Sequence, residues 1–203
     1  MRLYYIHDPM CSWCWAFRPV WQELKKALPT AVSVSYVLGG LAPDSQSSMP
    51  LALQRQIQQH WHAIQQRVPG TMFNFEFWQD NTPRRSTYPA CRAVIAAKNQ
   101  GEMYEDAMIL AIQHAYYLQA QNPSDDEVLL ACAASLNLDM QSFEIDFKSR
   151  ACKEQLMSDI RLSQHLGAEG FPSLVLDIDG KHDSIAVDYT DMYAMLDKIN
   201  ARF

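Results

Sequence analysis

Two cysteines separated by two residues are the strongest chemical signal in the chain, in the motif Cys11-Ser12-Trp13-Cys14. They follow a short apolar and aromatic run at 3–6, typical of a buried strand, and they precede a longer run typical of a helix. A helix N-terminus presents unpaired N–H groups and a positive dipole end, and both favour a thiolate. The motif therefore predicts a redox site with Cys11 as its nucleophile.

The spacing also provides a second thiol for the same reaction. Residues i and i+3 of a helix have Cβ atoms about 5–6 Å apart, and a disulfide needs Cα atoms about 4.4–6.8 Å apart. We therefore expect Cys11 to attack a disulfide in a partner and Cys14 to resolve the mixed disulfide that forms. The reverse sequence of steps oxidises a dithiol, so the motif alone leaves the direction of electron flow open.

Other uses of a cysteine pair fit the sequence less well. A zinc site needs a second pair of ligands, and Cys91, Cys132 and Cys152 occur singly, so we expect no metal. A purely structural disulfide in so short a loop would remove little entropy from the unfolded chain. Cys132 lies in an apolar stretch typical of a core, whereas the roles of Cys91 and Cys152 stay open.

Histidines and carboxylates are weaker candidates than the thiols. His7 follows the first strand, where we expect it to be solvated or to cap an element, with proton transfer as the alternative. His60 and His62 lie two residues apart, point in different directions from a helix and are expected on its surface. No clear buried carboxylate is evident for a proton relay.

Composition excludes some classes of partner. The chain has 203 residues, 48% of them hydrophobic, which is ample for a core, and a formal net charge of −6. We therefore expect neither a nucleic acid nor an anionic membrane surface as partner, because both attract basic faces. No secretory signal is visible at the N-terminus, so we expect a cytoplasmic location, where a dithiol tends to act as a reductant. The oligomeric state is not predicted.

The pattern of elements predicts an α/β fold. We expect a strand at 3–6, a helix at 11–28 and a strand at 32–38, then helices at 51–68, 89–100, 103–119, 124–136, 141–148 and 151–166, and finally strands at 173–178 and 184–187 and a helix at 189–200. Ser124 and Glu127 form a capping-box pattern that predicts Ser124 as a helix N-cap. All four strands should share one sheet, with helices on both faces and an all-helical insertion.

Three segments together resemble the DsbA-like branch of the thioredoxin superfamily, in particular its cytoplasmic FrnE-like group. They are the motif segment at 8–17, the segment Ser86-Thr87-Tyr88-Pro89-Ala90-Cys91-Arg92, and the loop Gly170-Phe171-Pro172-Ser173. The resemblance implies a thioredoxin-like domain at 1–49 plus 167–203 and a helical insertion domain at 50–166 that covers the active site. It also implies a protein-disulfide oxidoreductase with Cys11 and Cys14 as its catalytic residues.

The resemblance further implies how a substrate binds. The Phe171–Pro172 bond is expected to be cis and to lie beside the Cys-x-x-Cys motif, where the backbone of Phe171 pairs with an extended peptide. Trp13, Phe171 and Pro172 are therefore the expected substrate-binding residues. Trp15 is a further candidate for an apolar groove, although a place in the core is favoured for it. Partners would be protein or peptide thiols and disulfides, with no cofactor and with glutathione as a possible redox partner.

Two other functional classes share this fold. Kappa-class glutathione transferases and 2-hydroxychromene-2-carboxylate isomerases use glutathione and usually have Ser at the position of Cys11. The intact pair argues against that chemistry, because Cys14 would compete with a stable glutathione adduct. Some bacterial protease adaptors also share the fold and a similar cysteine-containing start, so a non-enzymatic adaptor is the third class.

Overall fold

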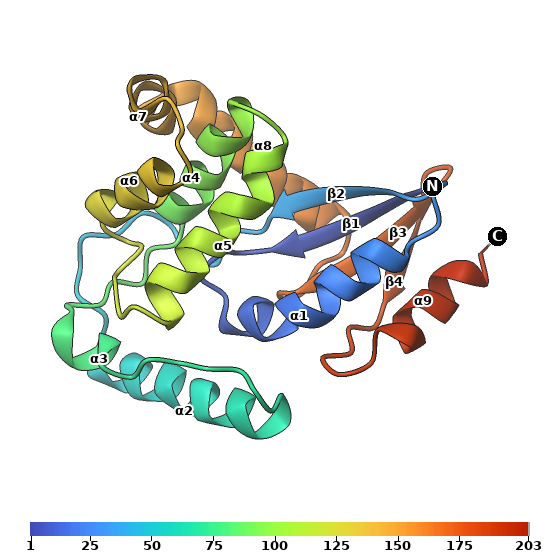
Figure 1. Ribbon diagram of the computed structural model, residues 1–203, viewed down its shortest axis with the longest axis horizontal. Helices are drawn as coiled ribbons and strands as arrows, with labels where there is room; N and C mark the ends of the chain where they lie inside the picture. Colours follow the sequence, from blue (N-terminus) through green and yellow to red (C-terminus); the bar gives the residue numbers. More distant parts are fainter. Residues whose placement is uncertain (203) are drawn as a thin grey trace.

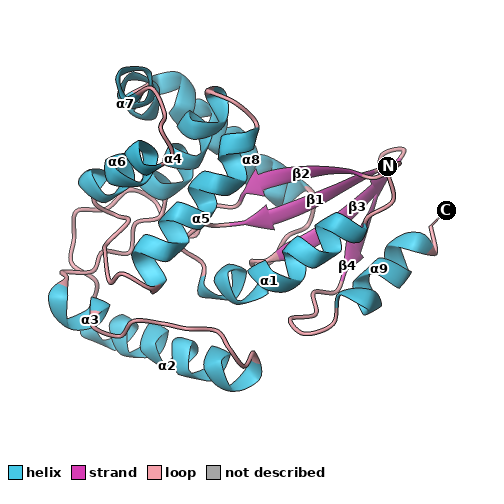
Figure 2. Cartoon of the chain, viewed as in Figure 1, coloured by secondary structure: helices cyan, strands magenta, loops and turns pink. Residues whose placement is uncertain are grey.

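The computed structural model describes residues 1–202, which form a four-stranded sheet surrounded by helices (Figures 1 and 2). The elements in chain order are β1 (Arg2–His7), α1 (Ser12–Ala27), β2 (Ser33–Leu38), α2 (Leu51–Arg67), α3 (Phe77–Asp80), α4 (Tyr88–Asn99), α5 (Met103–Tyr117), α6 (Asp126–Ser135), α7 (Met140–Lys148), α8 (Arg150–His165), β3 (Ser173–Ile178), β4 (Lys181–Ile185) and α9 (Met192–Asn200). The predicted α/β class with a helical insertion is confirmed.

The sheet has the strand order β2-β1-β3-β4. β1 runs parallel to β2, with Tyr5 opposite Tyr36, and antiparallel to β3, with Tyr5 opposite Leu174. β1 is joined to β2 through α1, β2 is joined to β3 through the helices α2 to α8, and β3 and β4 form a tight hairpin. β1 is therefore a central strand, and its C-terminal end delivers the chain to the Cys11 motif.

Helices cover both faces of the sheet, and β1 is accordingly buried on both, since Leu3 and Tyr5 on one face and Ile6 on the other are all buried. On one face Leu3 and Tyr5 pack with Phe17 of α1 and Met195 of α9. On the other face Ile6, Val37 and Val175 pack with Leu162 and Leu166 at the C-terminal end of α8. Figure 1 shows α1 and α9 on the near side of the strands and α8 behind them. Each face of the sheet thus has its own apolar core.

The helices between β2 and β3 lie at the C-terminal end of β1, with α4 almost wholly buried among them. One buried cluster joins this block to the active-site loop, because it contains Met10 together with Trp61, Ala90 and Tyr117. Helix α2 runs along one side of the molecule, at the bottom of the view in Figure 1. It contacts α1 through a small cluster that contains Ala16 and Ile64. No helix within residues 1–202 is long and apolar enough to cross a membrane.

Local details differ from the sequence predictions where tertiary contacts intervene. Ser124 is not an N-cap, because α6 begins two residues later and the Ser124 hydroxyl donates to the Ser86 carbonyl at 2.8 Å. The short helix α3 was not predicted at all.

Elements near the C-terminus also have different bounds. β4 begins at Lys181 rather than at 184, since the left-handed φ values of Asp179 and Gly180 close a two-residue turn and pair Lys181 directly with Ile178. α9 begins at Met192 rather than at 189, with the Asp191 carboxylate accepting the N–H of Tyr193 at 2.8 Å.

The N-cap of α8 allows a simple test of these assignments. The hydroxyl of Ser149 accepts the N–H of Cys152 at 3.0 Å, so Ser149→Ala should lower the free energy of unfolding by about 1 kcal/mol in urea titrations. Ser158→Ala, an exposed substitution within the same helix, is the matched control and should not lower it. Equal effects of the two substitutions would contradict the assigned cap.

Candidate active site

The two thiols of the motif have different environments. Cys11 is the N-cap residue of α1 and is 7% exposed, whereas Cys14 lies in the first turn and is fully buried. The N–H of Cys11 donates to the carbonyl of Asp8 at 3.0 Å, which turns the chain from β1 into the helix. Both thiols are free. A partner therefore reaches Cys11 first, and Cys14 is shielded behind it.

The loop at 170–173 lies beside Cys11, although it is distant in sequence. The Phe171–Pro172 peptide bond is cis, and the Cys11 thiol donates to the carbonyl of Phe171 at 3.3 Å. Pro172 itself is buried. Gly39, just after β2, is what admits the Phe171 ring, because a Cβ at Gly39 would lie 2.0 Å from two ring carbons. The ends of β1 and β2 and the start of β3 thus meet at the dithiol.

A cavity of about 270 Å³ opens next to Cys11. Cys11, Trp13 and Phe171 line one side of it, and Leu53, His60, Arg85 and Tyr116 from the helical block are among the residues that line the other. Trp15 lines a different, larger cavity of about 820 Å³ and stacks on Tyr117 with ring centroids 5.8 Å apart. Of the two tryptophans that flank Cys14, only Trp13 borders the cavity beside Cys11.

A buried carboxylate lies close to the motif, so the expectation that none would be found was wrong. Asp8 is fully buried and accepts four hydrogen bonds, from the N–H groups of Met10 and Leu41 at 2.8 Å each, from the Thr87 hydroxyl at 2.7 Å and from the Cys91 thiol at 3.6 Å. Burial raises the pKa of Asp8, and these donors oppose the rise. The signal available in the sequence was an aspartate directly at the end of a buried strand.

The surroundings of Cys14 keep it protonated. Burial, then the neighbouring Cys11 and the charge of Asp8, hold the pKa of the Cys14 thiol well above its ordinary value. Tyr5 and Tyr117 lie near the pair, and burial raises the pKa of both hydroxyls, with further contributions from neighbouring tyrosines and from the two thiols. Cys14 is therefore a protonated thiol at neutral pH.

The comparisons with known proteins agree with this geometry. A family model described as Thioredoxin matches residues 4–198. The chain belongs to this thioredoxin family. The structure is similar to a putative protein disulfide isomerase from Nitrosomonas europaea, with a TM-score of 0.83, 26% identity and coverage of 98% of this chain and 96% of that chain. It is also similar to the cytosolic disulfide reductase DsbM from Pseudomonas aeruginosa, with a TM-score of 0.77, 25% identity and coverage of 100% and 96%. The predicted DsbA-like membership within the thioredoxin superfamily is confirmed.

Other relatives carry different names. A 2-hydroxychromene-2-carboxylate isomerase matches with a TM-score of 0.66 and 14% identity over 100% of this chain and 95% of that one, a likeness of fold alone. Proteins named ClpXP adapter protein SpxH are similar in sequence, with 23% identity over 179 residues in Halalkalibacterium halodurans. That match covers 86% of this chain but spans only 58% of the relative's length. Oxidoreductases and adaptors thus both occur among thioredoxin-family relatives of this chain.

His7 does not have the solvated or capping role expected for it. It is 1% exposed, stacked on Tyr5 with ring centroids 5.0 Å apart and in edge contact with Tyr36 at 5.5 Å. Neither ring nitrogen has a hydrogen-bond partner among residues 1–202. Burial, with a smaller contribution from Arg18, lowers the pKa of His7 to about 3. His7 is therefore a neutral core residue at physiological pH.

The remaining cysteines are buried and unpaired. Cys132 belongs to the apolar core, as predicted, and burial raises its pKa to about 11. The Cys152 thiol donates to the carbonyl of Arg92 at 3.4 Å, and burial raises its pKa to about 12. Cys91 faces Asp8, and burial holds its pKa well above the ordinary value. None of these three cysteines lines the cavity beside Cys11, and each packs as a small apolar side chain in the core.

The contact between Gly39 and Phe171 yields a first prediction for the site. In Gly39→Ala the new methyl group must displace the Phe171 ring, which moves the carbonyl that faces Cys11. We expect the rate of disulfide reduction to fall about tenfold, a barrier change of about 1.4 kcal/mol. Gly170→Ala, where the added Cβ has no neighbour within 4 Å, is the control in the same loop. Equal rates for the two variants would contradict this role of Gly39.

The burial of His7 yields a second prediction. The pKa of His7 is about 3 in the folded protein, below the ordinary value of 6.5. The free energy of unfolding is therefore highest above pH 6.5 and decreases as the pH falls, because the unfolded chain binds a proton that the folded protein does not. Between about pH 7 and about pH 5, wild type should lose about 2 kcal/mol more unfolding free energy than His7→Phe. Urea titrations measure this, with the exposed His62→Phe as control. Parallel pH dependences of wild type and His7→Phe would disprove it.

Proposed function

We propose that this protein is a thiol–disulfide oxidoreductase that acts through the dithiol of Cys11 and Cys14. The observation that carries the proposal is the position of the Cys11 sulfur, at the wall of a cavity and 3.3 Å from the Phe171 carbonyl beside a cis proline. A sulfur at this position would contact a disulfide that enters the cavity, and the Cys14 thiol is buried behind it. Similarity to a disulfide reductase and a putative disulfide isomerase over nearly the whole chain supports the same activity.

The reduction of a partner proceeds in two exchanges that transfer two electrons. The Cys11 thiolate attacks one sulfur of the partner disulfide, the partner's S–S bond breaks, and its other sulfur leaves as a thiolate that takes up a proton. Cys14 then loses its proton and attacks the Cys11 sulfur, which releases the second partner thiol and leaves a Cys11–Cys14 disulfide. A thiol such as glutathione would restore the dithiol by the reverse exchanges.

The same site supports a mode of substrate binding. The carbonyl of Phe171 accepts the Cys11 thiol in the free protein, and an extended substrate backbone would take over that acceptor when Cys11 reacts. Trp13 and Phe171 contribute apolar cavity wall, and Pro172 fixes the turn of the loop. We propose these three as the substrate-binding residues, with residues 50–166 as an insertion domain over the thioredoxin-like domain at 1–49 plus 167–203.

A named relative supports a proposal for the direction of electron flow and for the location of the protein. DsbM is described as a cytosolic disulfide reductase, and one of its structures contains GSH, with 23% identity to this chain. We propose that this protein also acts as a reductant in the cytoplasm, with glutathione as its electron donor. An adaptor role is the second candidate, which the names of the SpxH relatives favour.

Trapping of the mixed disulfide tests the proposal. In Cys14→Ser the second exchange is blocked, so partners should accumulate as adducts on Cys11, detectable by non-reducing gels and mass spectrometry. Cys11→Ser/Cys14→Ser is the control and should trap nothing. Absence of Cys11 adducts would refute the oxidoreductase. Capture of one dominant partner to the same extent in the double variant would support an adaptor instead.

A further inference from the structure

The charge of the cavity beside Cys11 is opposite to that of the whole protein. The chain has a formal net charge of −6, yet no Asp or Glu of the described residues lines this cavity. The charged side chains that do line it are Arg84 and Arg85, and the imidazole of His60 adds a hydrogen-bonding group from α2. A molecule that enters to react with Cys11 thus meets positive charge within a mostly apolar wall.

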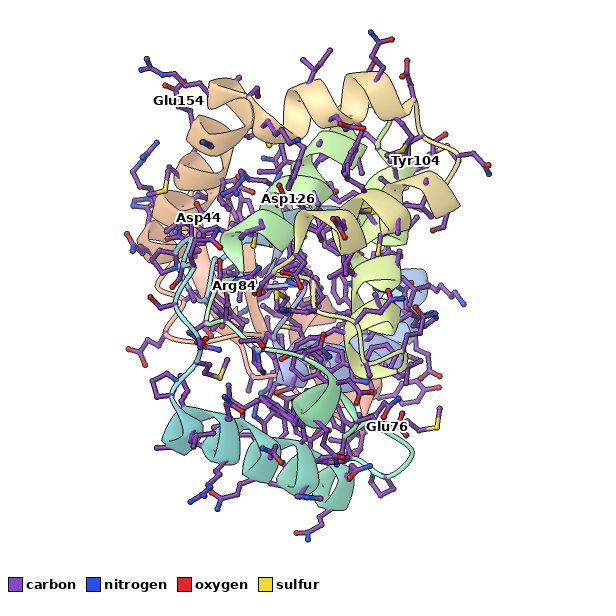
Figure 3. The ribbon with its side chains drawn as sticks, turned by 90° about the vertical axis from the view of Figure 1, so that its left-hand side faces the viewer. Asp44, Glu76, Arg84, Tyr104, Asp126 and Glu154 are labelled. Carbon is purple, nitrogen blue, oxygen red and sulfur yellow. The ribbon has the colours of Figure 1, made fainter. Side chains whose placement is uncertain are left out.

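The backbone around the two arginines is held firmly at the cavity. The segment at 81–87 joins α3 to α4, and Arg84 forms an isolated antiparallel bridge with Ser48. Next to it, the N–H of Met49 donates to the carbonyl of Pro83 at 2.7 Å. Figure 3 shows Arg84 between the helix that carries Asp126 and the segments that lead toward α2. The position of this charge relative to Cys11 is therefore set by the fold rather than by a free loop.

The two arginines have different partners. Arg84 donates to the Ser124 carbonyl and pairs with Asp125 at 2.6 Å, so much of its charge is already compensated. Arg85 is exposed and has no carboxylate within 4.0 Å among residues 1–202. Burial raises the pKa of the Tyr116 hydroxyl, which also lines the cavity. The positive charge of the nearby Arg85 guanidinium partly opposes this rise. Arg85 is thus the cation available to a ligand in the cavity.

We infer that this cavity selects small disulfides and thiols that carry a carboxylate, and that Arg85 is the residue that determines this specificity. The inference rests on the proposed function, because it names the substrate class of the same site. A cavity of about 270 Å³ admits a small thiol or a short extended segment but not a folded surface. An arginine binds a carboxylate through two parallel hydrogen bonds, whereas a lysine acts as a point charge and does not form this paired arrangement.

Three small disulfides of different charge test this selection. Glutathione disulfide carries carboxylates, 2-hydroxyethyl disulfide is neutral and cystamine is cationic, and each is reduced by the same exchange at Cys11. Stopped-flow tryptophan fluorescence would give the rate at which the reduced wild type, Arg85→Gln and Arg85→Glu react with each disulfide. Arg55→Gln, an exposed substitution on α2 outside the cavity, is the matched control.

We expect the ratio of the rates for glutathione disulfide and 2-hydroxyethyl disulfide to fall about tenfold in Arg85→Gln and further in Arg85→Glu, where cystamine becomes the better substrate. In wild type and Arg55→Gln the ratio should fall as salt is added. Unchanged ratios in both Arg85 variants would overturn the inference while leaving the oxidoreductase intact. Failure of wild type to reduce any of the three disulfides would instead overturn the proposed function.

Discussion

The arrangement of the site depends on the hydrogen bonds that the buried carboxylate of Asp8 accepts. This carboxylate accepts the N–H of Met10 in the motif loop, the N–H of Leu41 after β2 and the hydroxyl of Thr87 at the start of α4. A buried carboxylate is costly unless donors surround it, and here the donors come from three separate segments of the chain. The sheet, the dithiol and the helical block are therefore fixed relative to one another by one side chain, and loss of any donor would leave a buried charge undersatisfied.

The same constraint separates the roles of the two thiols. Because Asp8 holds the loop before α1, Cys11 is placed at the helix N-cap and at the cavity wall, and Cys14 three residues later falls inside the core. The buried thiol has its pKa raised by its apolar surroundings, by Cys11 and by the negative charge of Asp8. Two chemically identical residues thus acquire unequal reactivity from one turn of helix. In the proposed reaction this asymmetry would set the order of the exchanges, because the outer sulfur must react before the inner one gains a partner.

Sequence patterns predicted the parts of this fold that depend on local periodicity. The strand before Cys11, the helix after it and the long helices of the insertion were found because burial of one face repeats along each of them. Ser124 was misassigned because a capping pattern competes with tertiary acceptors, and the Ser86 carbonyl takes its hydroxyl. The burial of His7 and Asp8 was not predicted because polar residue type suggests exposure, whereas Tyr36 of β2 covers His7 and Thr87 at the start of α4 binds Asp8. No local sequence pattern predicts that Phe171 approaches Cys11, and this contact was expected only from the family resemblance.

The sulfurs and the opposite wall of the cavity belong to different parts of the fold, which explains how one fold supports relatives with such different names. The reactive sulfurs and the Phe171 carbonyl belong to segments adjoining the sheet, so their geometry follows from the strand order and the turn at Asp8. The opposite wall of the cavity, with Leu53, His60 and Arg85, is built by the helical block. Substitutions in that block change what is admitted to Cys11 without moving the sulfurs. Selectivity can therefore change through the helical block, whereas the chemistry changes when the motif itself changes, as in relatives of this fold that usually have Ser at the position of Cys11.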